Sequence, residues 1–159
     1  MTDSATRDET GIRFPPPFIY GLFFLAGVGI HRLYPVTLWS GEPAWPDPVG
    51  GVLIGAGVAF ALWAAFTFRA AGTAVNPTKP ATTIVAYGPF RFTRNPMYLS
   101  LATIYLGGVV MVESLWPLVL FPVTIWVVRT QIIAREETYL ERKFGAAYLD
   151  YKKRVRRWL

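Results

Sequence analysis

Two apolar segments of the chain are separated by YGPFRFTRNPMYL, residues 87–99, the stretch around which the fold is organised. Gly88 and Pro89 end any helix that enters it, because glycine loosens the backbone and proline lacks an N–H donor. Asn95 followed by Pro96 predicts the next helix start, since asparagine caps helices and proline suits their first turn. The alternative is a loop at the membrane surface, with arginines facing anionic lipid and rings in the interface.

The composition is typical of a membrane protein. Of the 159 residues, 53% are hydrophobic and 16% are charged, against roughly 25% charged residues in soluble domains. The length predicts a single domain. The sequence has no cysteine and one histidine, His31, which excludes disulfides, thiol nucleophiles and a histidine-based metal cluster. We therefore predict no metal site.

The apolar segments predict an all-α fold, an integral membrane bundle of four transmembrane helices with an amphipathic C-terminal helix. The predicted elements are a flexible tail at residues 1–13 and spans at about residues 17–38, 49–68, 96–112 and 115–133. The connection between the last two spans is short, so we expect these two helices to form an antiparallel hairpin. In the second span, Gly51, Gly55 and Ala59 share one helical face, which predicts close contact with another helix.

The chain from residue 134 to residue 159 is predicted to form cytoplasmic or interfacial helices. Leu140, Phe144 and Tyr148 share one face of a helical pattern, and an apolar stripe continues through Tyr151 to Trp158. Lysines and arginines occupy much of the rest of the surface, and glycine at position 145 is expected to bend the helix. Such a segment lies at the membrane surface, with its rings buried and its bases on lipid phosphates.

The charge distribution predicts the orientation. The net charge is +6, and residues 129–159 contribute +5 of it, from nine basic and four acidic side chains. The connections between spans one and two, and between spans three and four, carry acids alone. The positive-inside rule therefore places both termini and the loop at residues 70–95 in the cytoplasm. A basic face on a membrane protein indicates anionic lipids as partners, and no nucleic acid.

Two blocks of sequence carry a family resemblance. GPFRFTRNPMY, residues 88–98, resembles the signature of the isoprenylcysteine carboxyl methyltransferase and phospholipid methyltransferase family. The second block follows in the family's order, after a hydrophobic stretch long enough for two helices. It consists of Arg135, Glu136, Glu137, Leu140, Phe144, Gly145, Tyr148 and Tyr151. Together the blocks cover about the second half of the chain, and the resemblance implies an integral-membrane methyltransferase.

The resemblance also implies a cofactor and its binding residues. S-adenosyl-L-methionine (S-adenosylmethionine) would lie in a cytoplasm-facing pocket between the last two spans, the preceding loop and the C-terminal helix. The implied cofactor-binding residues are Thr83, Ile84, Val85, Phe90, Asn95, Pro96, Met97, Tyr98 and Glu136. Glu136 would bind the amino group or the ribose, with Glu137 in a supporting catalytic role. The alternative for these two acids is a solvated pair balanced by Arg135.

The sequence departs from the family at two positions. Many members have histidine where Asn95 stands, and asparagine cannot titrate, so no proton transfer is expected there. In the carboxyl methyltransferases an arginine one turn before the acids helps to hold the substrate carboxylate, and the aligned residue here is Ile132. Arg129, a further turn back, is the predicted substitute and a candidate catalytic residue. The identity of the acceptor stays open.

The residue types suit methyl transfer, which requires donor and acceptor to be held in line and water to be excluded. We therefore predict methyl transfer from S-adenosylmethionine to a lipophilic small molecule or lipidated substrate that enters from the bilayer. Within this class, a lipid amine N-methyltransferase and a carboxyl O-methyltransferase are both open. An NADPH-dependent enzyme resembling sterol reductases and a non-catalytic membrane scaffold are the alternatives from other classes, and cofactor binding discriminates between them.

Overall fold

The computed structural model describes residues 15–41, 43–75 and 80–158. These residues form helices and connecting loops, without a β-strand among them, which confirms the all-α prediction. The predicted flexible tail at residues 1–13 lies outside the described residues. The described elements are α1 (Pro16–Leu33), α2 (Pro46–Ala70), the 3₁₀ turn η2 (Gly88–Arg91), α3 (Pro96–Val112), α4 (Leu115–Val127), the π-helical turn η3 (Val128–Ile133), α5 (Ala134–Phe144) and α6 (Ala146–Arg154).

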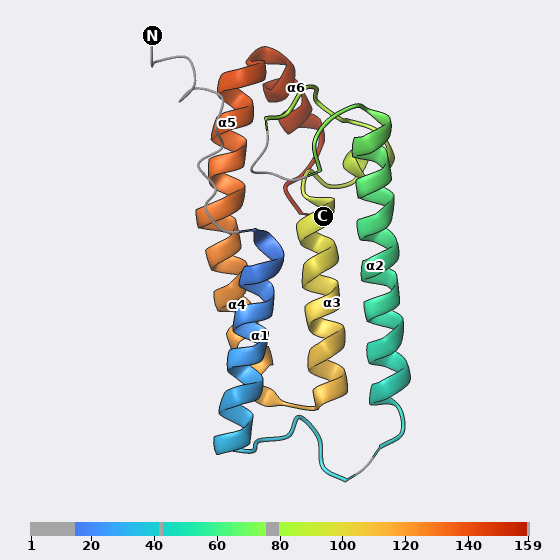
Figure 1. The fold of residues 1–159 in the computed structure, drawn as a ribbon, viewed down its shortest axis with the longest axis vertical. Helices are drawn as coiled ribbons and strands as arrows, with labels where there is room; N and C mark the ends of the chain where they lie inside the picture. The colour runs from blue at the N-terminus through green and yellow to red at the C-terminus, as the bar shows by residue number, and fades with distance from the viewer. Residues whose placement is uncertain (1–14, 42, 76–79, 159) are drawn as a thin grey trace.

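The long helices form an elongated bundle in which α1 and α3 run opposite to α2 and α4 (Figure 1). Helices α4 and α5 are continuous through η3, so that one helix runs from Leu115 to Phe144. The start of α1, the end of α2 and the start of α3 lie in the half of the bundle that carries α5 and α6 (Figure 1), and residues from all three of these helices line one cavity there. We call this end of the bundle the site end.

Two helices in the described part of the chain are long and apolar enough to cross a membrane, Pro46–Ala70 and Leu115–Phe144. Helix α3 is apolar but has only 17 residues, with the bounds that the sequence predicted. Helix α1 ends at Leu33, before the predicted limit at residue 38, because the chain turns there into an extended segment. The structure therefore supports two of the four predicted membrane spans by length and composition, and the other two stay a prediction.

Prolines and a left-handed turn set the helix boundaries. Pro96 lies in the first turn of α3, as predicted, and Asn95 occupies the capping position. The prediction that the Asn95 side chain caps the helix is wrong, because its amide donates instead to the carbonyl of Arg157 at 2.8 Å. Glu113, at φ 53°, ends α3, and Ser114 caps α4 by accepting a hydrogen bond from the Trp116 amide. This two-residue connection makes α3 and α4 antiparallel, as expected.

The contact between α2 and α3 uses other glycines than the sequence predicted. The predicted face is exposed at all three of its residues, Gly51, Gly55 and Ala59. The helices instead approach at Gly50 and Gly57, where an added Cβ would lie 2.7 Å from the Gly107 carbonyl oxygen and 2.9 Å from that of Ser100. Both positions therefore exclude a side chain. Helix α2 turns the face of Gly50 and Gly57 toward α3, so the predicted contact through Gly51, Gly55 and Ala59 is not the one that these helices make.

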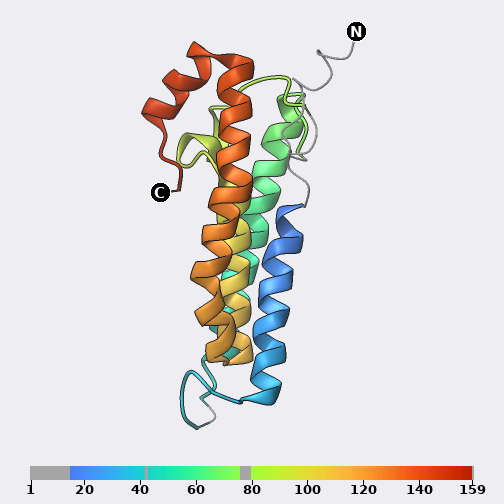
Figure 2. The same ribbon diagram turned by 90° about the vertical axis from the view of Figure 1, so that its left-hand side faces the viewer.

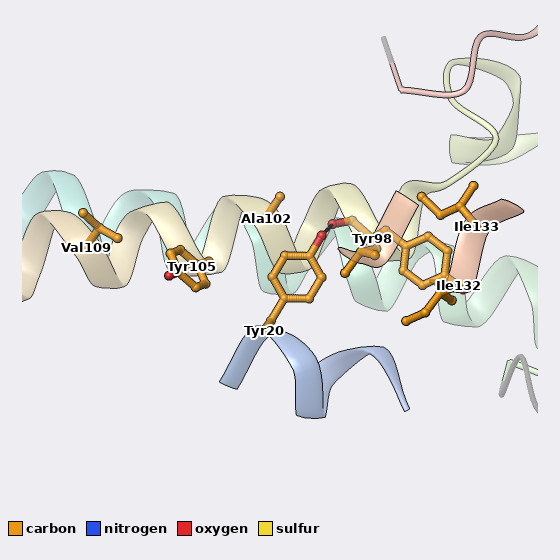
Figure 3. Packing of buried hydrophobic residues seen from close by; sticks show 8 residues of the cluster. Tyr20, Tyr98, Ala102, Tyr105, Val109, Ile132 and Ile133 are labelled. Carbon is orange, nitrogen blue, oxygen red and sulfur yellow. Dashed lines mark hydrogen bonds between the residues drawn. The ribbon is translucent and has the colours of Figure 1, made fainter. Parts of the chain in front are cut away.

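The main core lies between α1, α3 and the long C-terminal helix, as Figure 3 shows. Its tyrosines combine large apolar area with satisfied hydroxyl groups, as buried tyrosines require. The Tyr20 hydroxyl donates to the Tyr98 carbonyl at 3.1 Å, and the Tyr105 hydroxyl donates to the Pro117 carbonyl at 2.8 Å. Tyr20 thereby ties α1 to the start of α3, where the candidate site lies.

The C-terminal segment folds back over the site end (Figure 2). Gly145 adopts φ 53° between α5 and α6, which confirms the predicted bend. Helix α6 ends at Arg154, so the predicted helical stripe through Trp158 is wrong beyond that residue. Tyr148 and Tyr151 are buried against the protein itself, where they pack with apolar residues of α5 and of the loop before η2.

Candidate active site

Two neighbouring cavities lie at the site end. The large cavity has a volume of about 350 Å³, within the roughly 300–1,000 Å³ of small-molecule sites. The small cavity has a volume of about 60 Å³, room for a few water molecules only. Five residues, which we call the shared residues, line both cavities: Phe68, Phe90, Arg94, Asn95 and Glu136.

The loop before α3 brings Phe90 and Arg94 to this place. Gly88 has φ 60°, and an added Cβ would lie 2.9 Å from the hydroxyl oxygen of Thr67 on α2, so glycine is required there. The ring of Phe90 lies 4.3 Å from that of Phe68, centroid to centroid. The Tyr151 hydroxyl donates to the Phe90 carbonyl at 2.7 Å, which fixes the loop to α6.

Glu136 presents a carboxylate to both cavities. The side chain is half-buried, and its Oε2 accepts a hydrogen bond from the Tyr98 hydroxyl at 2.6 Å. Tyr98 is only 5% exposed, and its carbonyl accepts a hydrogen bond from Tyr20. Tyr98 of α3, itself held by α1, therefore fixes the position of this acid, and within the described residues the other oxygen of Glu136 has no hydrogen-bond partner.

The neighbouring acid, Glu137, is buried in an ion triad with two arginines. Its Oε1 lies 3.0 Å from Arg94 Nη1, and both of its oxygens accept hydrogen bonds from Arg157. The side chain of Glu137 is 7% exposed and that of Arg94 is 9% exposed. A buried carboxylate requires such partners, because taking a charge out of water costs several kcal/mol. The hydrogen bond to Glu137 also raises the pKa of the Arg157 guanidinium.

Arg94 has an unused donor in this buried setting. Its Nη1 is close enough to Glu137 for an ion pair but is not aligned for a hydrogen bond, and its Nε has no hydrogen-bond partner in the described part of the chain. A buried donor without a partner costs roughly 1–3 kcal/mol. Arg94 lines both cavities, but these two nitrogens are fully buried, so another part of its side chain faces the cavities.

The last described residues hold this loop in place. The Arg94 amide donates to the Arg156 carbonyl at 2.9 Å. The Arg157 carbonyl accepts from the Thr93 hydroxyl at 3.1 Å and from the Asn95 side-chain amide at 2.8 Å. The C-terminal segment therefore supports the loop that lines both cavities, although Arg156 and Arg157 line neither.

The structure gathers the predicted cofactor-binding residues around the two cavities. Phe90, Asn95 and Glu136 line both. The remaining ones divide between the large cavity, lined by Pro96, Met97 and Tyr98, and the small cavity, lined by Thr83, Ile84 and Val85. Of the two predicted catalytic residues, Glu137 lines the small cavity within its ion triad. Arg129 is exposed on η3 and lines neither cavity, so the structure does not bring it to the site.

The sequence prediction did not assign Arg94, Arg157, Tyr148 and Tyr151 to the site. Arg94 stands directly before Asn95 in the first motif, and both tyrosines belong to the second block, so each had a sequence signal. Burial raises the pKa of the Tyr148 hydroxyl, and the charge of Glu137 raises it further, so this wall of the small cavity is a neutral phenol. No sequence feature distinguished Arg157, because it is one of several basic residues near the C-terminus.

The chain is similar to known proteins over much of its length. A family model described as phospholipid methyltransferase matches residues 47–147. The chain is also 46% identical over 63 residues to an uncharacterized protein of Haemophilus influenzae, an alignment that covers 40% of this chain and all of that protein. No solved structure shows significant similarity to the chain. The family match, together with the two long apolar helices, indicates a membrane protein with methyltransferase activity on a lipid-related substrate. The chain belongs to the phospholipid methyltransferase family.

Proposed function

We propose that the protein transfers a methyl group from S-adenosylmethionine to a lipophilic acceptor at the cytoplasmic surface of the membrane. The observation that carries this proposal is the pair of opposite charges among the shared residues. Arg94 and Glu136 line an apolar cavity large enough for a small molecule and, at the same time, a small cavity that Tyr148 and Tyr151 close. A charged cofactor and an apolar acceptor can meet at such a boundary.

The side chains present fit the amino-acid end of the cofactor. Glu136 would hold its ammonium group or its ribose, and the positive charge of Arg94, which lines both cavities, would attract its carboxylate. The small cavity suits only this charged end, because it has room for a few water molecules. When bound, the cofactor supplies a methyl group that the positive charge of its sulfonium already activates. The residues of the chain bind and orient it and exclude water, through the packed rings of Phe68 and Phe90.

The acceptor is proposed to place its apolar part in the large cavity. Beyond the shared residues, that lining is mostly apolar. It comes from the start of α1 and the residue before it, from α2 and the loop that follows it, and from α3: Pro15, Pro16, Pro17, Ala61, Val75, Met97 and Leu101. An acceptor that inserts an apolar chain among these residues would bring its polar end toward Arg94 and Glu136. Burial of apolar area then supplies the binding energy, at roughly 25 cal/mol per Å².

Binding of S-adenosylhomocysteine tests the proposal most directly. We expect calorimetry on the purified protein in detergent to detect binding, and to detect no binding of NADPH. Glu136→Gln keeps the shape of the side chain but removes one charge-assisted hydrogen bond worth about 1.5–3 kcal/mol, and so lowers the affinity about tenfold to a hundredfold. Glu141→Gln, on the same helix but outside both cavities, is the matched control. Binding of NADPH without S-adenosylhomocysteine would favour a reductase instead.

The site end is proposed to face the cytoplasm, where its bases meet anionic lipid. Cysteine labelling with a membrane-impermeant reagent on intact cells tests this orientation. Ser40 and Ala86 are both exposed. They belong to the α1–α2 connection and to the loop before η2, which lie at opposite ends of the bundle (Figure 1). In the cysteine-free chain, Ser40→Cys should be labelled and Ala86→Cys should be labelled only after the cells are opened. The reverse pattern would place the site on the outer side.

A further inference from the structure

A group of aromatic side chains is exposed where α2 meets the loop before α3. The ring of Phe92 lies 6.4 Å from that of Trp63, centroid to centroid, and the guanidinium carbon of Arg91 lies 4.9 Å from the centre of the Phe92 ring. Phe66 and Arg69 follow Trp63 at intervals of three residues, so each lies beside the one before it on the helix, and both are exposed. We call Trp63, Phe66, Arg69, Arg91 and Phe92 the outer patch.

The two arginines of the outer patch carry charges that the described residues do not neutralise. Neither guanidinium pairs with a carboxylate in the described part of the chain. Arg94, three residues after Arg91, is the contrast, because its side chain is buried against Glu137. The loop therefore turns one arginine toward the protein and the other toward its surroundings. Arg91, held over the Phe92 ring by a cation–π contact, is placed to attract an anion.

The position of the outer patch along α2 fits the surface of a bilayer. Trp45, directly before α2, and Trp63 are both 47% exposed and lie 18 positions apart. At ~1.5 Å per residue this separation is about 27 Å, close to the roughly 30 Å of the hydrocarbon core. Residues 49–62, between the two, contain no polar side chain. Exposed tryptophans at both ends of an apolar helix are typical of the two membrane interfaces, so the outer patch lies at the level of the lipid headgroups.

We infer that the outer patch binds the headgroup of an anionic phospholipid, with Arg91 on its phosphate and the rings of Phe92 and Trp63 against its glycerol and upper acyl region. This inference goes beyond the proposed function and does not depend on it, because it requires only that the chain lies in a membrane. Helix α2 stands at the edge of the bundle, so lipid can reach this face (Figure 1). A symmetric dimer through the same face is disfavoured, because it would bring the unpaired arginines of both copies together.

Native mass spectrometry of the full chain in detergent tests the role of Arg91, with phosphatidylglycerol and phosphatidylcholine of identical acyl chains as the probes. The wild type should bind phosphatidylglycerol more tightly. Arg91→Gln should lower the affinity for phosphatidylglycerol about fivefold, the effect of one basic residue near a membrane surface, and leave that for phosphatidylcholine unchanged. Arg91→Lys keeps the charge and should retain the preference. Arg154→Gln, which removes an exposed base of α6 outside the outer patch, is the matched control and should behave as the wild type. Unchanged affinity in Arg91→Gln, or equal losses in Arg91→Gln and Arg154→Gln, would overturn the proposal.

A nitroxide spin label on the cysteine-free chain tests the depth of the outer patch and the nature of its occupant. The label is attached in Phe66→Cys or in the control Val52→Cys, which lies on nearly the same face of α2 and is also exposed. In vesicles of phosphatidylcholine and phosphatidylglycerol, collision rates with oxygen and with a water-soluble nickel chelate should place position 66 at the headgroups and position 52 in the hydrocarbon core. Equal depth at both positions, or position 66 in bulk water, would overturn the proposal. Shielding of position 66 from both reagents would also overturn it, since a second copy of the protein would then cover the patch.

Discussion

Removal of residues 155–159 is expected to lower the affinity for S-adenosylhomocysteine by about tenfold to a thousandfold while leaving the helical bundle folded. Three hydrogen bonds connect this segment to residues 93–95, and each is worth about 0.5–1.5 kcal/mol. Their loss frees the loop that presents Arg94, and removes the Arg157 side chain from Glu137. Calorimetry measures the affinity, and circular dichroism of the same preparation reports on the helices.

A substitution within the segment separates this effect from simple attachment to lipid. Arg156 is exposed and contributes its backbone carbonyl to the loop contact, so Arg156→Gln removes a surface charge and keeps the hydrogen bond. This variant should bind S-adenosylhomocysteine as the wild type does. If the truncated chain also binds with unchanged affinity, the C-terminal segment serves only as a lipid anchor and is no part of the site.

Replacement of Gly57 by leucine is expected to destabilise the protein by about 3 kcal/mol or more, the upper end of the usual cost of overpacking. An added Cβ on Gly57 would already lie 2.6 Å from a side-chain carbon of Ile104 and 2.9 Å from the carbonyl oxygen of Ser100. The backbone of α3 is fixed by its own hydrogen bonds, so α2 must move away from it. That movement would also open the large cavity, which both helices line.

Gly55→Leu is the matched control for this prediction. Gly55 lies on the same helix with no heavy atom within 4 Å of an added Cβ, so leucine there gains helix propensity without a clash. Thermal unfolding in detergent, followed by tryptophan fluorescence, should show a clear loss for Gly57→Leu and no loss for Gly55→Leu. Equal stability of the two variants would mean that α2 and α3 do not pack as closely as described.

The motif at residues 87–99 predicted the local backbone structure correctly, because glycine and proline act on the backbone of their immediate neighbours. Pro96 placed the first turn of α3, and Gly88 and Pro89 interrupted the chain where η2 now stands. The same motif did not reveal the partner of Asn95. A side chain at a capping position can form a hydrogen bond with its own helix or with a distant segment. Here the side-chain amide of Asn95 donates to the carbonyl of Arg157, far along the chain.

The predicted face of α2 shows the limit of pattern reasoning in an apolar helix. Gly51, Gly55 and Ala59 form a regular stripe, yet Gly50 and Gly57 make the contact. When nearly every residue of a helix is apolar, hydrophobic periodicity does not say which face is buried. Which face is buried then depends on how the surfaces of two helices fit together, and a single sequence does not carry that information.

What the sequence by itself determined was the all-helical architecture, the boundaries of α3 and the group of residues around the site. Long apolar runs, prolines, glycines and two family blocks are local or collinear signals, so a reader of the chain can find them. Only the tertiary structure decided that Glu136 faces both cavities while its neighbour Glu137 is buried between Arg94 and Arg157. The physical reason is that the partners of a buried charge come from segments distant in sequence, and folding alone brings them within reach.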